Sequence, residues 1–282
     1  LATVSRLAKN FSDIVRSHSE AFSGLVSGIP YGDHESAAVI RALITGSQKD
    51  ISPEVRDAFR DSGASHILGL SGMHLALIYA IMLKILAPIG NGPAARKIRS
   101  VLIIISSGYY TLLTGASPSL VRAFLFIALK ETAAILGRET KAMGTFSTAL
   151  MIQLAVAPAN ICSAGFQLSY LAVAGISLLH PVTKEWYPGP ATPMKRIWDA
   201  ASLTISCQIF TAPAVWLHFG TFPKYFLITN LIAVPLSNCI MTAAVITVLL
   251  ASAGCCPEML ALACGKATGL LCSILEAIST LP

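Results

Sequence analysis

Charged residues are scarce in this sequence. Only 12% of its 282 residues are Asp, Glu, Lys or Arg, whereas soluble domains carry about 25%. Hydrophobic residues make up 54%, and the mean hydropathy is +0.69. The composition therefore argues against a soluble globular domain and predicts a protein that crosses a membrane several times.

Motifs for metal, redox and nucleotide chemistry are also missing. The seven cysteines form no CxxC pair and lie in or beside apolar runs, so we interpret them as small buried side chains. The sequence contains no His-x-His-x-Asp-His run, no acidic cluster and no nucleotide-binding loop. We expect no cofactor, no metal site, no catalytic residue and no enzymatic activity. The chain begins at Leu1 without a signal-peptide pattern, which suggests a piece of a longer protein.

Residues 1–62 differ in charge from the rest of the chain. They hold seven Lys and Arg against eight Asp and Glu, whereas residues 63–282 hold thirteen against six. Apolar residues of 1–26 recur at three- and four-residue steps, which predicts an amphipathic helix. Two short helices, about residues 34–45 and 53–61, should follow. We therefore predict an amphipathic, interfacial segment at 1–62 and a polytopic transmembrane domain at 63–282.

Long apolar stretches dominate the second part, and a membrane span needs roughly 20 such residues. The candidates are 66–88, 98–116, 119–137, 143–158, 161–180, 197–217, 225–253 and 258–281. The stretch 225–253 is too long for one crossing and contains Pro235, so we expect a broken or re-entrant helix followed by a full span. The predicted fold is an all-α polytopic membrane protein with about seven to eight transmembrane or half-spanning helices, preceded by short amphipathic helices.

Basic residues in the loops predict the orientation of the chain. Ten Lys and Arg lie in alternate loops, at residues 84–99, 130–141 and 184–196. The opposite set of loops carries only Arg122 and Lys224. Since cytoplasmic loops are enriched in positive charge, the three basic loops should face the cytoplasm. Residues 1–62 and the His66 end of the first span should then lie on the outer side.

Polar residues at the start of the first span are candidates for function, because ionisable groups within a membrane are costly. Residues 63–74 read Gly-Ala-Ser-His-Ile-Leu-Gly-Leu-Ser-Gly-Met-His. They contain His66, Ser71, Gly72 and His74, and Ser71 and His74 should share a helix face. A hydrogen-bonded helix start would explain a single histidine, but this concentration of polar and small residues favours a functional site.

Other polar residues begin later spans at the same outer side. Arg122 lies where the orientation rule does not explain a positive charge, so it is the best candidate to face a pore or an anion; a snorkelling arginine is the alternative. Gln167 and Asn230 are polar where lipid would disfavour them, and we expect both to face the interior of the helix bundle.

These blocks, in this order, resemble the ComEC family, the inner-membrane DNA-uptake channels of naturally transformable bacteria. The resemblance covers about residues 36–250. It rests on the block at 63–74, on Thr114-Gly115 with Val121-Arg122-Ala123, on Gly165-Phe166-Gln167-Leu168-Ser169, and on Asn230-Leu-Ile-Ala-Val-Pro235-Leu236. It implies a multi-pass protein of the bacterial inner (cytoplasmic) membrane that passes single-stranded DNA into the cytoplasm. The residues expected to line or shape that channel are His66, Ser71, Gly72, His74, Arg122, Gln167, Asn230 and Pro235.

The same resemblance implies the partners of the chain. Full-length members of the family also carry an outer OB-like domain and often a metallo-β-lactamase-like domain taken to be a nuclease, and neither is recognisable in this sequence. The expected partners are therefore single-stranded DNA, the lipid membrane and these two domains of a longer protein. The sequence leaves open whether the chain forms a homo-oligomer.

Two other functions stay open from the sequence. Gly69-Leu70-Ser71-Gly72 matches the short GxSG motif of rhomboid-like intramembrane serine proteases. That chemistry would need His180 or His218 within hydrogen-bonding distance of Ser71. An interrupted helix near the middle of the membrane would also suit a small-molecule transporter, although no inverted repeat is visible.

Overall fold

The computed structural model describes residues 2–90, 92–187, 189, 192–220, 222–255 and 257–281. These residues form helices and turns, and no strand occurs among them, which confirms the all-α prediction. The N-terminal helices are α1 (Ala2–Ser27), α2 (His34–Thr45), α3 (Pro53–Asp61) and α4 (Ser65–Leu68). The rest comprises α5 (Gly72–Ile85), η1 (Ala87–Ile89), α6 (Pro93–Leu113), α7 (Pro118–Ile135), α8 (Ala142–Val156), η2 (Pro158–Cys162), α9 (Ala164–Leu178), α10 (His180–Lys184), α11 (Pro193–Phe219), α12 (Phe226–Ser252) and α13 (Glu258–Ser279).

Each predicted apolar stretch overlaps one main helix, in chain order α5, α6, α7, α8, α9, α11, α12 and α13. In the described part of the chain, α11, α12, α13 and the stretch Gly72–Ile89 are long and apolar enough to cross a membrane. The apolar helices α8 and α9 are shorter. Large apolar side chains are exposed on the long helices, for example Ile105 at 62% on α6 and Leu217 at 83% on α11. Such side chains are suited to contact lipid tails.

Helix α12 corrects the expectation of a broken or re-entrant segment at 225–253. It is one continuous helix from Phe226 to Ser252, with Pro235 inside it. A proline removes one backbone hydrogen bond. An interruption of the helix would leave several polar backbone groups unpaired in apolar surroundings, which costs much more. The proline therefore does not end the helix.

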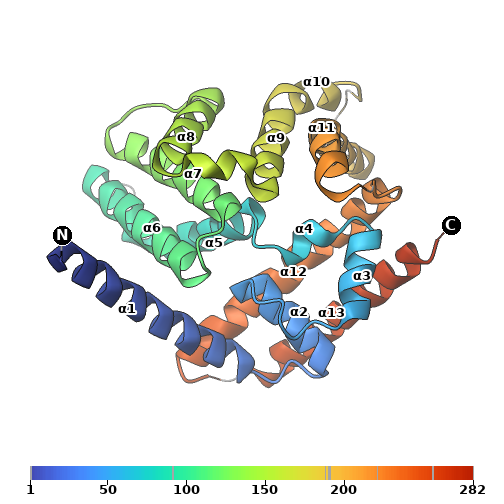
Figure 1. Ribbon diagram of the computed structural model, residues 1–282, viewed down its shortest axis with the longest axis horizontal. Coiled ribbons are helices and arrows are strands. Elements are labelled where there is room, and N and C mark those ends of the chain that lie inside the picture. The colour runs from blue at the N-terminus through green and yellow to red at the C-terminus, as the bar shows by residue number, and fades with distance from the viewer. Residues whose placement is uncertain are drawn as a thin grey trace.

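The larger hydrophobic core joins the two ends of the chain. It contains residues of α2, α3 and α4 together with residues of α12 and α13, including the fully buried Ile40, Phe59 and Leu271. Figure 1 shows α2, α3 and α4 next to α12 and α13. The division predicted at residue 62 concerns position relative to the membrane, and it stays a prediction. The side chains of α2 and α3 nevertheless pack into the same hydrophobic core as those of α12 and α13.

A second core lies between α5, α6 and α7, around Leu75, Ile103 and Leu120. Beside it the buried carboxylate of Glu131 accepts hydrogen bonds from the Tyr79 hydroxyl and the Ser100 hydroxyl, both at 2.6 Å. One acidic side chain of α7 thus connects all three helices.

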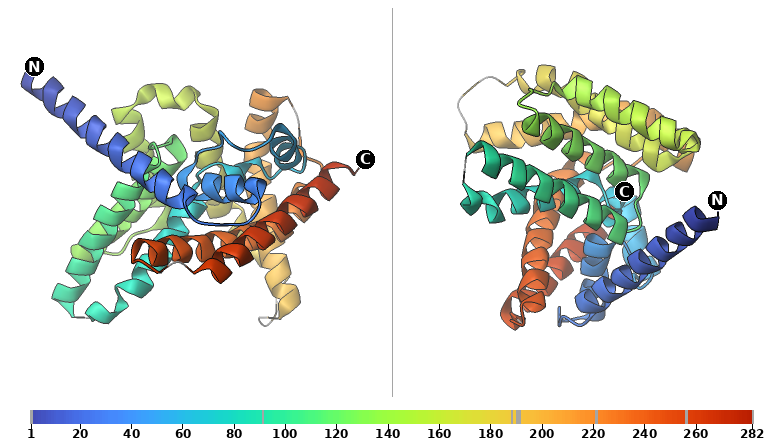
Figure 2. Two further views of the ribbon diagram at one scale, coloured as in Figure 1. Left: turned by 90° about the horizontal axis from the view of Figure 1, so that it is seen from below. Right: turned by 90° about the vertical axis from the view of Figure 1, so that its left-hand side faces the viewer.

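The turns of two helix pairs lie on one side of the molecule. Figure 2 (left) shows the end of the α5–α6 pair and the end of α11 nearest α10 both at the lower side, while the N-terminal part of α1 projects at the upper left. These turns include the basic loops 84–99 and 184–196. The loop-charge rule places both loops on one side of a membrane, and which side faces the cytoplasm stays a prediction.

Candidate functional site

The start of α5 is built by Ser71 and His74. Ser71 is the N-cap residue: its hydroxyl oxygen accepts a hydrogen bond from the backbone N–H of Met73 at 3.3 Å. The Nδ1 atom of His74 accepts the backbone N–H of Ser71 at 3.2 Å and lies 3.0 Å from the Ser71 hydroxyl oxygen. This is a capping box, with histidine in the position usually held by Glu or Gln. Ser71 and His74, whose spacing predicted a shared helix face, form a direct contact whose first effect is to begin α5.

His74 is completely buried, and its second ring nitrogen has an unusual position. Because Nδ1 accepts the Ser71 N–H, a neutral His74 ring carries its proton on Nε2. That nitrogen is buried and has no hydrogen-bond partner among the described residues. His66, on α4, lies near His74. The side chain of His66 is exposed even though α4 lies in the middle of the molecule (Figure 1). The two histidines are thus neighbours, one buried and one exposed.

Arg122 lies on α7, and its side chain is buried, with 7% exposed. One guanidinium nitrogen donates a hydrogen bond to the backbone oxygen of Ser169 on α9. The guanidinium also lies over the rings of Phe126 and Tyr170, at 5.6 and 5.8 Å. Its Nε atom has no partner, and none of the ion pairs within the described residues includes Arg122. Arg122 is therefore a buried cation without a carboxylate partner in the described part of the chain.

Gly72 lies between the Ser71–His74 pair at the start of α5 and the Arg122 guanidinium on α7. A Cβ atom at Gly72 would lie 3.0 Å from a terminal nitrogen of Arg122 and 3.5 Å from the Cβ atom of Ala123. The absence of a side chain thus lets the start of α5 approach the guanidinium on α7. The structure brings Ser71, Gly72, His74 and Arg122 together from two predicted spans, and we call these four residues the outer cluster.

Two residues that sequence reasoning missed support the outer cluster from α8 and α9. The amide nitrogen of Gln153 donates to the backbone oxygen of Pro118, at the start of α7, at 3.0 Å. The amide oxygen of Gln153 accepts a hydrogen bond from the hydroxyl of Tyr170, also at 3.0 Å. Gln153 is buried, and its hydrogen bond holds the Tyr170 ring, which lies against the Arg122 guanidinium. The sequence signal for it was an uncharged polar residue inside the short apolar stretch 143–158.

Three other predicted residues, Gln167, Asn230 and Pro235, are not hydrogen-bonded to the outer cluster within the described residues. Gln167 contacts Nε2 of His218 on α11 at 2.8 Å, and its amide nitrogen donates to the backbone oxygen of Ile161. Asn230 is in the early part of α12 with its side-chain oxygen buried and unpaired. Pro235, further along α12, is exposed.

His180 and His218, the two candidates for the general base of a serine protease, have hydrogen-bond partners other than Ser71. His180 Nδ1 contacts the hydroxyl of Ser202 at 3.2 Å, and His218 is paired with Gln167. Neither of them is hydrogen-bonded to Ser71 in the described structure, and the histidine that contacts Ser71 is His74. Among the described residues, no group of three or more His, Cys, Asp and Glu side chains is arranged to hold a metal ion.

Substituting Ser71 by alanine should lower the stability of the protein by about 1 kcal/mol, because the α5 cap would lose its acceptor oxygen. The measurement is thermal unfolding of the purified protein. Ser252→Ala is the control, because it changes an exposed serine at the end of α12 and should have little effect. Labelling of Ser71 by a serine-reactive fluorophosphonate would contradict a purely capping role.

Comparison with known proteins places this arrangement in a family. A family model described as "Competence protein" matches residues 43–282. ComE operon protein 3 of Bacillus subtilis is 25% identical over 219 residues, covering 77% of this chain and 27% of that protein. Competence protein ComA of Neisseria gonorrhoeae is 27% identical over 244 residues, covering 84% of this chain and 32% of that protein. The uncharacterized protein YcaI of Escherichia coli is 24% identical over 207 residues, covering 71% and 27%.

The chain thus spans about a quarter to a third of the length of these relatives. No solved structure matches it. The family match covers most of the chain, including every residue of the outer cluster, and the relatives confirm the resemblance seen in the sequence. This chain is a multi-pass membrane protein that belongs to the ComEC-type competence protein family.

Proposed function

We propose that this chain forms the membrane part of a channel through which single-stranded DNA enters the cytoplasm during natural transformation. The family membership supports a role in DNA uptake, because two relatives are named as competence or ComE operon proteins. The proposed location is the bacterial inner membrane. The proposed partners are single-stranded DNA, lipid, and the OB-like and nuclease-like domains of a longer protein.

The observation that carries this proposal is the buried charge of Arg122, which forms no ion pair with any residue that the structure describes. Burying a cation without a carboxylate is costly, so a protein that keeps one usually gains a function from it. A DNA strand carries a phosphate for every nucleotide and loses hydration when it enters an apolar passage. The guanidinium of Arg122 has a buried Nε–H without a described partner, at the predicted outer ends of α7 and α9. In a passage that opens beside it, pairing of this group with phosphate would lower that cost.

The chain itself is proposed to have no enzymatic role. The Ser71–His74 contact has a complete explanation as a helix cap, because both partners also bond to the backbone at the start of α5. No observation favours the transporter alternative either, since α12 is continuous through Pro235. Degradation of the second DNA strand would then belong to another domain or protein.

Changing Arg122 to glutamine should reduce DNA uptake by about tenfold or more. A hydrogen bond to a charged group contributes about 1.5–3 kcal/mol, and about 1.4 kcal/mol corresponds to a factor of ten. The measurement is transformation frequency and entry of labelled DNA in a naturally transformable host that carries the complete protein. Membrane levels of each variant should be measured in parallel.

Two further variants make this test specific. Lys224→Gln removes an exposed basic residue predicted to lie on the same outer side, so it should leave uptake unchanged. Arg122→Lys keeps the charge and should retain part of the activity. Normal uptake by Arg122→Gln at the membrane level of the unmodified protein would contradict the proposal.

A further inference from the structure

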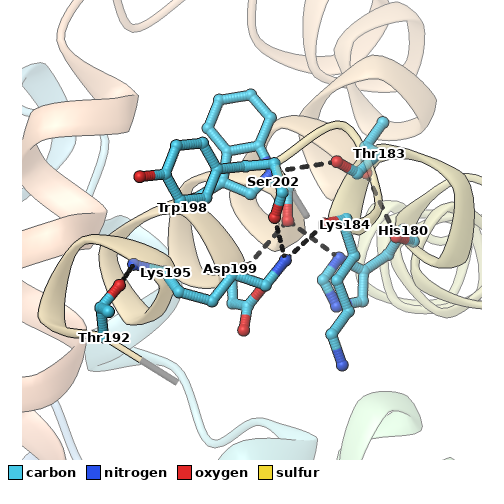
Figure 3. Close-up of polar contacts among 9 residues, drawn as sticks. His180, Thr183, Lys184, Thr192, Lys195, Trp198, Asp199 and Ser202 are labelled. Carbon is cyan, nitrogen blue, oxygen red and sulfur yellow. Dashed lines mark hydrogen bonds and ion pairs between the residues drawn. The ribbon is translucent and has the colours of Figure 1, made fainter. Parts of the chain in front are cut away.

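A second polar cluster lies at the turn between α9 and α11, on the side predicted to be cytoplasmic. Figure 3 shows its residues on α10 and on the first turns of α11. The Lys195 ammonium donates to the backbone oxygens of Lys184 and Tyr187, both at 2.7 Å, and lies 3.2 Å from the Asp199 carboxylate. The charge of Lys195 is therefore used to hold the turn together.

Beside this turn is an open cavity of about 670 Å³. It is lined by His180, Pro181, Lys184, Glu185, Gly189 and Lys195. The ammonium group of Lys184 has no hydrogen bond or ion pair with another described residue. His180 uses Nδ1 for its contact with Ser202, which leaves Nε2 without a described partner. Two nitrogen-bearing side chains that line the cavity are thus free to bind a ligand.

The charged groups that act on His180 are more basic than acidic. Burial lowers the pKa of His180, and the charge of Lys184 lowers it further. The Asp199 carboxylate acts in the opposite direction with a smaller effect than Lys184, and Lys195 adds to the lowering. Although Glu185 also lines the cavity, the field that His180 experiences favours an anion.

The surroundings of the cavity are those of a membrane interface. The side chains of Trp186 and Tyr187 are exposed, at 69% and 43%, and aromatic residues with a polar atom concentrate at the level of lipid headgroups. Val182, Met194 and Ile197 are also exposed, at 55%, 59% and 48%. An anion bound here would have its charge beside Lys184 and an apolar surface next to it, which matches a lipid better than a free ion.

We propose that the cavity beside α10 binds the phosphate group of an anionic phospholipid of the cytoplasmic leaflet. Lys184 pairs with the phosphate, and Nε2 of His180 donates to it once the ring is protonated. Lys195 holds the turn that shapes the cavity and does not need to contact the lipid. Basic pockets between the cytoplasmic ends of membrane helices bind anionic headgroups by this chemistry. The inference is independent of DNA transport.

The test measures binding of phosphatidylglycerol and phosphatidylcholine to the complete purified protein, by native mass spectrometry from detergent. Lys184→Gln should weaken phosphatidylglycerol binding about fivefold, which is the effect of one basic residue at a membrane surface. Lys224→Gln, an exposed lysine that does not line the cavity, should not change it. Binding should tighten as the pH falls toward and below about 6.5, the ordinary histidine pKa, because burial and Lys184 lower the pKa of His180 in the free protein whereas a bound phosphate favours the protonated ring. His180→Gln should remove this pH dependence.

The results that would overturn the proposal are distinct. Equal binding of phosphatidylglycerol by the Lys184→Gln and Lys224→Gln variants would show that the cavity is not the lipid site. Equal binding of phosphatidylcholine and phosphatidylglycerol would show that negative charge is not recognised. Displacement of the lipid by inorganic phosphate at equal concentration would identify a site for a soluble anion instead.

Discussion

Replacing Gly265 by alanine should strongly destabilise the protein. Gly265 lies on α13, and a Cβ atom there would be 1.6 Å from the backbone oxygen of Tyr31. That oxygen belongs to the turn before α2, so it cannot move aside as a flexible side chain would. Overpacking typically costs about 1–3 kcal/mol, and we expect about 3 kcal/mol or more because α13 and the turn must separate.

The measurement is thermal unfolding of the purified protein in detergent, together with its level in the membrane. Gly144→Ala is the matched control, because Gly144 is in α8 and a Cβ atom there has no neighbour within 4 Å. That change should be neutral or raise stability, by up to about 1 kcal/mol from helix propensity. Since the obstacle is a main-chain oxygen, Tyr31→Ala should not rescue Gly265→Ala. Normal stability of Gly265→Ala would contradict the packing of α13 against this turn.

Replacing Glu131 by alanine should have the next largest effect. The carboxylate accepts from Tyr79 on α5 and Ser100 on α6, each at 2.6 Å, and the ammonium of Lys130 lies 5.0 Å from the centre of the Tyr79 ring. Hydrogen bonds to a charged group contribute about 1.5–3 kcal/mol each. Their loss would also leave two hydroxyls without their acceptor, so we expect a decrease in stability of about 3 kcal/mol or more.

The partners of Glu131 provide the controls. Tyr79→Phe and Ser100→Ala should each cost less than Glu131→Ala, and combining either with Glu131→Ala should add little, because the same bonds are already lost. Glu139→Ala removes an exposed carboxylate from the loop after α7 and should change stability by no more than about 0.5 kcal/mol. Fully additive losses in the double variants would show that the three side chains do not form one unit.

The amino-acid pattern was sufficient to predict the helices. Apolar runs of the right length predict spans, because a chain in lipid must satisfy its backbone within each helix. The Ser71–His74 contact was also predictable in outline, since residues three apart lie on one face of a helix. Ser52 and Pro53 marked the start of α3 by the same local rules. These features depend on neighbours in the sequence.

The features that the amino-acid pattern does not predict depend on interactions between segments that are distant in the sequence. Pro235 suggested a break, but α12 stays continuous within a core that α2, α3 and α13 complete. The partners of Arg122 are not near it in the sequence: Ser169 is 47 residues away. Gln153 was overlooked because its importance comes from Pro118 and Tyr170, which belong to other helices.

The sequence alone determined that this chain is an all-α membrane protein, where most helices begin, and which family it resembles, since each of these follows from local composition and motifs. Only the tertiary structure decided which polar residues meet. It joined Ser71, Gly72, His74 and Arg122 into one cluster and left Gln167, Asn230 and Pro235 outside it. The physical reason is that helix packing depends on close contacts such as that between Gly265 and Tyr31, which a one-dimensional pattern does not encode.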